Sequence, residues 1–156
     1  MRTIVFGAAL AAAGLLALFA APARAQVLQF TAKLSGAAET PPNDSKGAGA
    51  ITALYDTATN RLDWTVDYSG LTGPAIAAHF HGPAPPGEAA PIEVGLRPPL
   101  DSPMKGSATL TDAQAKDLMD GMMYFNIHTA AHQPGEIRGQ MEMEKASGQM
   151  EMKKAK

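Results

Sequence analysis

The sequence predicts an all-β fold, a Greek-key-like sandwich or barrel, with one short helix near residues 112–120. Short stretches of alternating apolar and polar residues recur along the chain, and clusters of Pro, Gly, Asn and Asp separate them. One stretch departs from this pattern and carries the signals of a capped helix. Cysteine is absent from the chain, so the domain must be stabilised by its hydrophobic core without disulfides.

The strands are expected, in order, at 27–34, 48–55, 62–68, 75–81, 92–96, 105–110, 122–129 and 136–142. Side chains two residues apart share a face of a strand, which divides each stretch into an apolar and a polar set. The apolar sets expected to face the core include Leu62, Trp64, Val66, Tyr68, Ile76, Ala78, Phe80, Met123, Phe125, Ile127 and Ile137.

The helix is expected to begin after Thr111, an N-cap residue with Gln114 in the capping-box position. Asp112 falls in the first turn, where the helix dipole favours a negative charge. The helix is expected to run to about Asp120 and to stop at Gly121.

Residues 1–25 have the pattern of a secretory signal peptide, with Arg2 ahead of an apolar run from 4 to 21. Small residues at Ala23 and Ala25 predict cleavage after Ala25, in preference to an uncleaved anchor. We therefore expect a periplasmic or secreted protein with a β domain at 26–143 and a polar, flexible Met/Lys/Glu-rich tail at 144–156.

The composition argues against two classes of partner. The formal net charge is −2, and without a basic patch nucleic acid is not an expected partner. After the signal peptide no segment is apolar enough, over enough residues, to be expected to span a bilayer. A metal ion is the partner that the residues suggest, whereas nothing in them identifies a protein partner.

Three motifs, in this order, resemble the CHRD (chordin-type) domain family: HFHGPA at 79–84, LMDGMMYFNIHT at 118–129 and PGEIRGQ at 134–140. The opening FTAKLSG at 30–36 and ETPP at 39–42 also match the start of that domain. The resemblance extends over about residues 28–141. It implies an extracytoplasmic, β-sandwich-like domain and supplies no biochemical activity.

All four histidines of the chain, His79, His81, His128 and His132, lie within or beside these motifs. His79 and His81 share the face of their strand that points away from the core, and His128 takes the same face of a later strand. If these two strands are neighbours, about 4.8 Å apart, their imidazoles can reach a common metal. Nitrogen ligands without a thiolate suit copper or zinc, and otherwise the histidines are structural and hydrogen-bond loop carbonyls.

Polar residues near the histidines form a candidate outer set. Glu136 is a candidate for orienting an imidazole, Arg138 for attracting an anion, and Asn126 for orienting a loop through its amide. Alternatively, Glu136 and Arg138 form a surface ion pair that contributes little to stability.

Two Met-x-Met pairs, Met141/Met143 and Met150/Met152, favour copper over zinc because thioethers are ligands for Cu(I). Met141 is also a candidate core residue, and the second pair can be ordinary tail residues.

The sequence thus leaves three functions open. The first is an exported copper-binding protein, and the second is a non-catalytic interaction or structural module without metal. The third is a copper-dependent oxidoreductase of the superoxide dismutase type, although that fold's long metal loop, zinc-site Asp and disulfide have no counterpart in this sequence.

Overall fold

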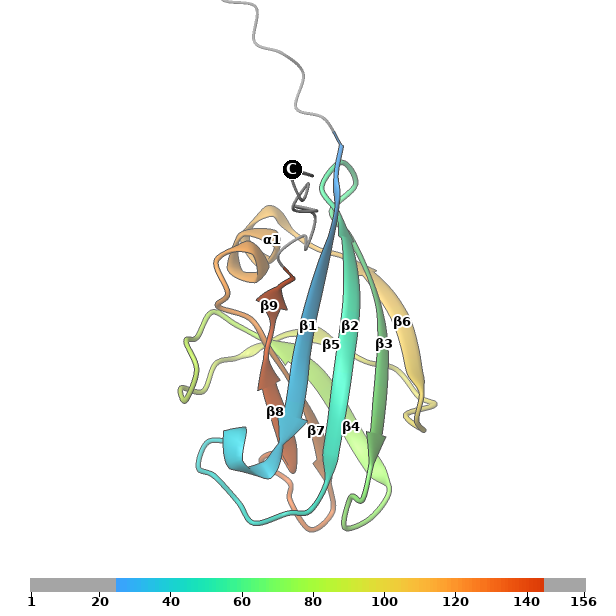
Figure 1. The fold of residues 1–156 in the computed structure, drawn as a ribbon, viewed down its shortest axis with the longest axis vertical. Helices are drawn as coiled ribbons and strands as arrows, with labels where there is room; N and C mark the ends of the chain where they lie inside the picture. Colours follow the sequence, from blue (N-terminus) through green and yellow to red (C-terminus); the bar gives the residue numbers. More distant parts are fainter. Residues whose placement is uncertain (1–24, 145–156) are drawn as a thin grey trace, which may run out of the picture.

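The computed structural model describes residues 25–144, and every expected strand is present to within a residue or two (Figure 1). The elements are β1 (Val27–Ser35), the 3₁₀ helix η1 (Gly36–Ala38), β2 (Ala48–Asp56), β3 (Arg61–Ser69), β4 (Ala75–His81), β5 (Ile92–Gly95), β6 (Met104–Thr109), α1 (Asp112–Met119), β7 (Tyr124–Thr129), β8 (Ile137–Gln140) and β9 (Glu142–Met143). Residues 1–24 of the predicted signal peptide (1–25) and residues 145–156 of the predicted tail (144–156) lie outside the described residues.

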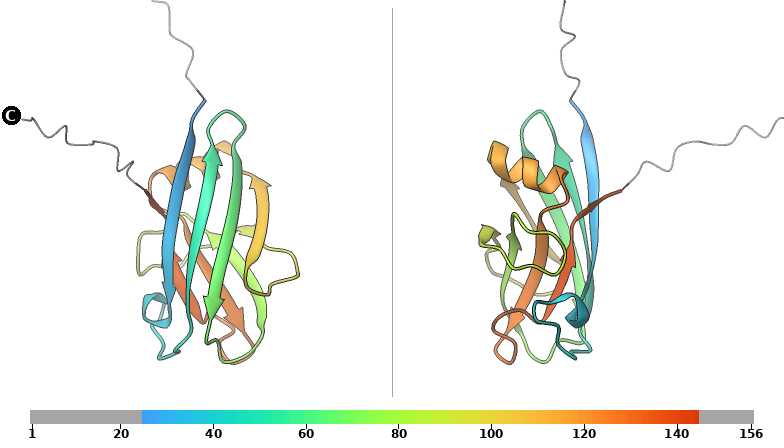
Figure 2. Two further views of the ribbon diagram at one scale, coloured as in Figure 1. Left: turned by 45° about the vertical axis from the view of Figure 1, so that its right-hand side comes forward. Right: turned by 90° about the vertical axis from the view of Figure 1, so that its left-hand side faces the viewer.

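The strands form one continuous sheet, in the order β5-β4-β7-β8-β1-β2-β3-β6, with β9 pairing with β1. This sheet folds over into two layers, β5-β4-β7-β8 and β1-β2-β3-β6 (Figures 1 and 2). The layers are joined where Ser35 of β1 pairs with Arg138 of β8. The chain leaves β3 for the other layer and returns to place β6 beside β3, a connection of the expected Greek-key kind.

The core lies between the two layers and is built from the expected apolar sets. Phe80 of β4 is its centre, with its ring centroid 5.1 Å from that of Trp64 and 4.9 Å from that of Phe125. Both contacts are edge-to-face, the arrangement that aromatic quadrupoles favour. Other fully buried members are Phe30, Leu62, Val66, Met123, Ile127 and Ile137.

The helix α1 begins as its sequence predicts. The Thr111 hydroxyl accepts from the Gln114 backbone N–H, and the Gln114 side chain accepts from the Thr111 N–H, which completes the capping box. Ala115 and Leu118 are its buried residues. The helix ends at Met119, one residue before the expected Asp120.

Ile76 does not face the core as expected. Its side chain is 56 % exposed, whereas Ala78 and Phe80 of the same strand are fully buried. The cause is a register irregularity between Ala75 and Ala77 in the pairing with β7. Such a bulge interrupts the two-residue alternation of faces. The alternation therefore predicts the buried face correctly only for the residues of β4 that come after the bulge.

The outer side of β4, β7 and β8 is buried as well, which the alternation does not predict. Glu136 and Arg138, which the sequence places away from the core, are 0 % and 2 % exposed. Two loops supply partners on this side: Arg138 donates to Thr40, and Gln140 donates to the Ala84 carbonyl. A polar layer is therefore enclosed between the sheet and its loops.

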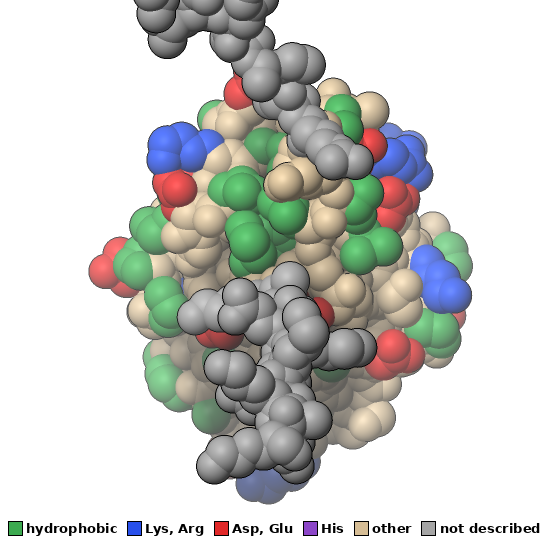
Figure 3. All heavy atoms as spheres, turned by 45° about the horizontal axis from the view of Figure 1, so that its top comes forward, with side chains coloured by type: hydrophobic (Ala, Val, Ile, Leu, Met, Phe, Trp, Pro, Cys, Tyr) green, Lys and Arg blue, Asp and Glu red, His purple; other side chains and the backbone are tan. Residues whose placement is uncertain are grey.

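Within residues 25–144, no helix has the length and hydropathy needed to cross a membrane. On the end of the molecule seen in Figure 3, blue Lys and Arg side chains are scattered among red Asp and Glu side chains. The part of this end that is not covered in grey therefore presents no basic patch.

Candidate metal centre

Three histidines meet on two adjacent strands. β4 and β7 pair antiparallel, with His79 opposite Asn126 and Ala77 opposite His128. One ligand nitrogen each from His79, His81 and His128 lies within 4.8 Å of the others. The prediction that the strand of His79 and His81 neighbours the strand of His128 is confirmed.

Backbone carbonyls fix two of the rings. Nδ1 of His81 lies 2.9 Å from the Ala90 carbonyl oxygen, and Nδ1 of His128 lies 2.8 Å from that of Gln133. Because a carbonyl oxygen only accepts, each Nδ1 carries the hydrogen and donates it. For His81 this leaves Nε2 as a lone-pair donor, the tautomer and orientation found in metal-ligating histidines.

The lone pairs of these two rings differ in their surroundings. Nε2 of His81 is buried, and among the described residues it has no hydrogen-bond partner. Nε2 of His128 lies 3.1 Å from Nδ1 of His79 and 3.0 Å from Oδ1 of Asn126. An amide oxygen only accepts, so this nitrogen can bind a metal only when the Asn126 amide turns its Nδ2 toward the ring or moves away. The expected outer residue Asn126 thus contacts a histidine of the group, whereas the position of His81 leaves a buried acceptor unused.

Two imidazoles of the site, those of His79 and His81, have lowered pKa values. Burial, with smaller effects from His128 and His81, lowers the pKa of His79 to about 4. Burial is also the largest cause that lowers the pKa of His81. Metal ligation requires the unprotonated ring, so both side chains are in the ligating form at neutral pH.

The donor set matches the chemistry of copper or zinc. Three imidazole nitrogens with no sulfur are ligands that both ions accept. Bonds of about 2 Å place the ligands of a tetrahedral ion roughly 3.3 Å apart. A spread of up to 4.8 Å therefore has to contract when an ion binds. Three protein ligands leave one position of a four-coordinate ion open.

The structure does not bring His132 into this group. The half-buried His132 lies in the loop between β7 and β8, where its backbone N–H donates to the Thr129 carbonyl and its carbonyl accepts from the Gly135 N–H. Those bonds hold the turn that also positions the Gln133 carbonyl beside His128.

Glu136 forms its hydrogen bonds away from the histidines. Its carboxylate accepts from the Ser45 hydroxyl, the Thr72 N–H and hydroxyl, and the Thr129 hydroxyl. Burial opposes ionisation, but these four bonds together lower its pKa to about 2. Instead of the expected imidazole or Arg138, the Glu136 carboxylate holds two loops and the end of β7.

Arg138 and His81 lie on opposite sides of one tyrosine ring. The Tyr124 and His81 rings are stacked, 4.8 Å apart and 1° from parallel. The Arg138 guanidinium carbon lies 3.4 Å from the Tyr124 centroid, a cation–π distance. No role was assigned to Tyr124 from the sequence. The available signal was its position four residues before His128, which places both side chains on one face of the strand.

The first methionine pair, Met141 and Met143, does not join the histidine group. Met141 is fully buried in the core, in line with one of the two readings of the sequence, and Met143 is 40 % exposed. The second pair, Met150 and Met152, lies outside the described residues.

Comparison with known proteins identifies a domain family for this chain but no individual related protein. No curated protein and no solved structure matches the chain. The CHRD domain matches residues 30–141, which contain both histidine-bearing strands and Arg138. It is an extracellular-type domain, and the β sandwich agrees with the fold that the resemblance implies. The chain therefore belongs to the CHRD domain family.

Proposed function

We propose that this chain is an exported metal-binding protein in which His79, His81 and His128 hold one transition-metal ion, copper in preference to zinc. The observation that supports the proposal most strongly is the buried Nε2 of His81, which has no hydrogen-bond partner among the described residues. A buried acceptor without a partner is costly. A metal in contact with this nitrogen and with the two facing imidazoles removes that cost.

The fixed tautomer of His81 adds a second argument. The Ala90 carbonyl holds Nδ1 of His81, so Nε2 is the nitrogen that this ring can offer to an ion shared with His79 and His128. Copper is preferred because Cu(II) binds nitrogen sites more tightly than zinc does.

The test is a metal titration of the untagged protein after chelation, by calorimetry and by electron paramagnetic resonance for Cu(II). We expect one equivalent to bind, with nitrogen hyperfine structure, and His81→Ala and His128→Ala to weaken binding by about 100-fold or more. His132→Ala is the matched control, since this histidine lies outside the group, and it should bind like the wild type. Equal affinity in all three variants would exclude the site and leave the non-catalytic interaction or structural module.

Export is tested separately. Mass spectrometry of the protein produced from the full chain should give a mature species that begins at Gln26. A species that retains residues 1–25 would contradict cleavage after Ala25 without affecting the metal proposal.

One observation favours a second candidate, a copper-dependent oxidoreductase of the superoxide dismutase type. His79 is only half-buried, and a three-histidine set leaves a coordination position for a substrate. The test is superoxide decay with copper-loaded protein, with His128→Ala at the same total copper as the control. A rate no higher than that of the control would exclude this activity and leave the binding function.

A further inference from the structure

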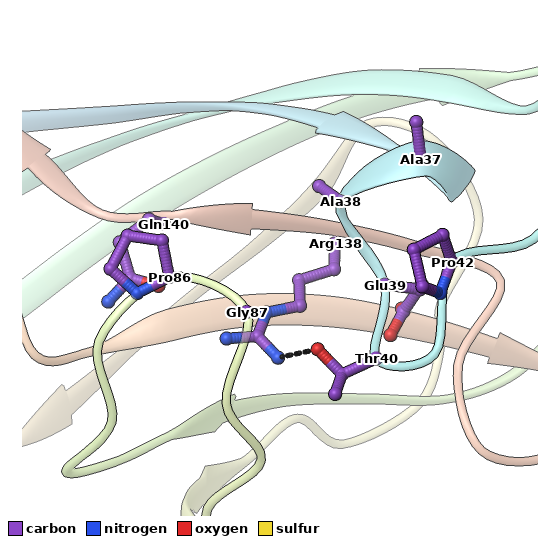
Figure 4. Close-up of a pocket in the computed structure, with 9 residues that line it drawn as sticks. All are labelled: Ala37, Ala38, Glu39, Thr40, Pro42, Pro86, Gly87, Arg138 and Gln140. Atoms are coloured by element: carbon purple, nitrogen blue, oxygen red, sulfur yellow. Dashed lines mark hydrogen bonds between the residues drawn. The ribbon is translucent and has the colours of Figure 1, made fainter.

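A pocket separate from the histidine group lies against β8. Its volume is about 320 Å³, and its walls include Glu39 and Thr40 from one loop, Pro86 and Gly87 from another, and Arg138 and Gln140 from β8. Figure 4 shows the Arg138 side chain extending between the two loops toward Thr40 and Gly87. A volume of this size accommodates a small organic or inorganic ion.

The residues that line this pocket carry several unpaired polar atoms. Six buried side-chain nitrogen or oxygen atoms in residues 25–144 lack a hydrogen-bond partner, and three of them belong to pocket residues: Nη2 of Arg138, Oε1 of Gln140 and Oε1 of Glu39. Arg138 is 2 % exposed and Glu39 is 6 % exposed. A buried cation with an unused donor is expensive, so these unpaired atoms indicate a ligand.

Arg138 is held in place to present that donor. Its Nη1 donates to the Thr40 hydroxyl at 3.0 Å, and its plane lies against Tyr124. Gln140 is fixed in the same way, because its Nε2 donates to the carbonyls of Ala84 and Gly121 and its Oε1 is left free. The pocket thus offers a cationic donor and a neutral acceptor, both pre-oriented.

The charge of Arg138 is not balanced by an ion pair within the described residues, where the salt bridges join Arg61 to Asp63 and Lys116 to Asp120. The nearest carboxyl group lining the pocket is that of Glu39, whose pKa is raised to about 7 mainly by burial. At neutral pH this group is partly protonated, so an anion can compete with it for Arg138.

We propose that this pocket binds a small oxyanion that also carries a hydroxyl group. The anionic oxygen accepts from Arg138 Nη2, and the hydroxyl donates to Gln140 Oε1. An α-hydroxycarboxylate and hydrogen phosphate share this chemistry. The proposal requires no metal and is independent of the proposed function.

The test is nuclear magnetic resonance titration of the metal-free protein with two matched ligand pairs. Lactate differs from propionate, and hydrogen phosphate from sulfate, by the presence of a hydroxyl donor. We expect the hydroxyl-bearing member of at least one pair to bind about tenfold more tightly, with shifts at the Arg138 and Gln140 side-chain N–H groups. The pair that shows the difference identifies the ligand class, and no difference within either pair would overturn the proposal.

Variants give an independent check with the tighter ligand. Arg138→Gln should weaken binding by about tenfold or more, while Arg61→Gln, at an exposed arginine, should leave it unchanged. Glu39→Gln removes the competing carboxylate at constant size and should strengthen binding several-fold, which keeps the test informative if Arg138→Gln fails to fold. Unchanged binding in both Arg138→Gln and Glu39→Gln would also overturn the proposal.

Discussion

Two buried polar clusters share strand β7 and differ in how their atoms are paired. The Glu136 cluster, formed by Glu136, Ser45, Thr72 and Thr129, satisfies both carboxylate oxygens with four hydrogen bonds. The histidine–arginine cluster, formed by His79, His81, His128, Tyr124 and Arg138, retains buried atoms without partners, Nε2 of His81 and Nη2 of Arg138.

This difference separates a structural role from a binding role. A fully paired buried network stabilises the fold and has no capacity left for a ligand. A partly paired one costs stability in the free protein and recovers it when a ligand supplies the missing partners. The two clusters should therefore respond in opposite ways to substitution and to added metal.

The largest effect is expected from the Glu136 cluster. Glu136→Ala should lower the free energy of unfolding by about 3 kcal/mol or more, because it removes four hydrogen bonds to a buried carboxylate and leaves the buried Thr129 hydroxyl without its acceptor. Urea unfolding of the metal-free protein measures the loss. His79→Ala is the comparison and should change stability by less than about 1 kcal/mol. Equal losses in the two variants would contradict the distinction between the clusters.

Metal should stabilise the protein through the histidine–arginine cluster alone. Free Cu(II) at 100 times its dissociation constant should raise the free energy of unfolding by about 2.7 kcal/mol. The gain should disappear in His81→Ala and persist in His132→Ala and in Glu136→Gln. Thermal unfolding with and without copper measures it, and loss of the gain in Glu136→Gln would show that the clusters are coupled.

Acid should act on the Glu136 cluster within a defined window. The pKa of Glu136 is lowered from 4.5 to about 2, so between these values the unfolded chain binds a proton that the folded protein does not. The stability contributed by this group is fully present above about pH 4.5 and is lost as the pH falls toward about 2. Glu136→Gln should have a shallower decline over this range in urea titrations, and an identical slope would contradict the assignment.

The smallest effect concerns the tyrosine between His81 and Arg138. Tyr124→Phe keeps the stacked ring and loses only the hydroxyl that accepts from the Ala90 N–H, so it should cost about 1 kcal/mol. Copper affinity should remain within about twofold, because His81 keeps its stacking partner. Tyr124→Leu removes the stack and should reduce affinity further, as measured by calorimetry; equal affinities in the two variants would show that stacking does not orient His81.

Much of the fold could be predicted from residue alternation. The alternation of Leu62, Trp64 and Val66 fixes a strand and its inner face, and Thr111 with Gln114 fixes the start of the helix. The grouping of the histidines could also be predicted from the alternation. His79 and His81 share a strand face, and the assumption that their strand lies beside the strand of His128 added the third histidine.

The remainder depends on contacts that no local pattern encodes. Alternation shows that Arg138 points away from the core but not that loops bury it there. The partners of Glu136 come from Ser45 and Thr72, far away in sequence, so only tertiary structure could identify them. The exposure of Ile76 follows from a bulge whose position the apolar pattern does not mark.

The connection between β4 and β5, residues 82–91, has a further consequence. Ala90 in this loop holds the His81 ring, while Pro86 and Gly87 form part of the oxyanion pocket. One short segment therefore contributes to both the histidine group and the pocket beside Arg138. An insertion or deletion between Pro86 and Ala90 would disturb the His81 ring and the pocket wall together.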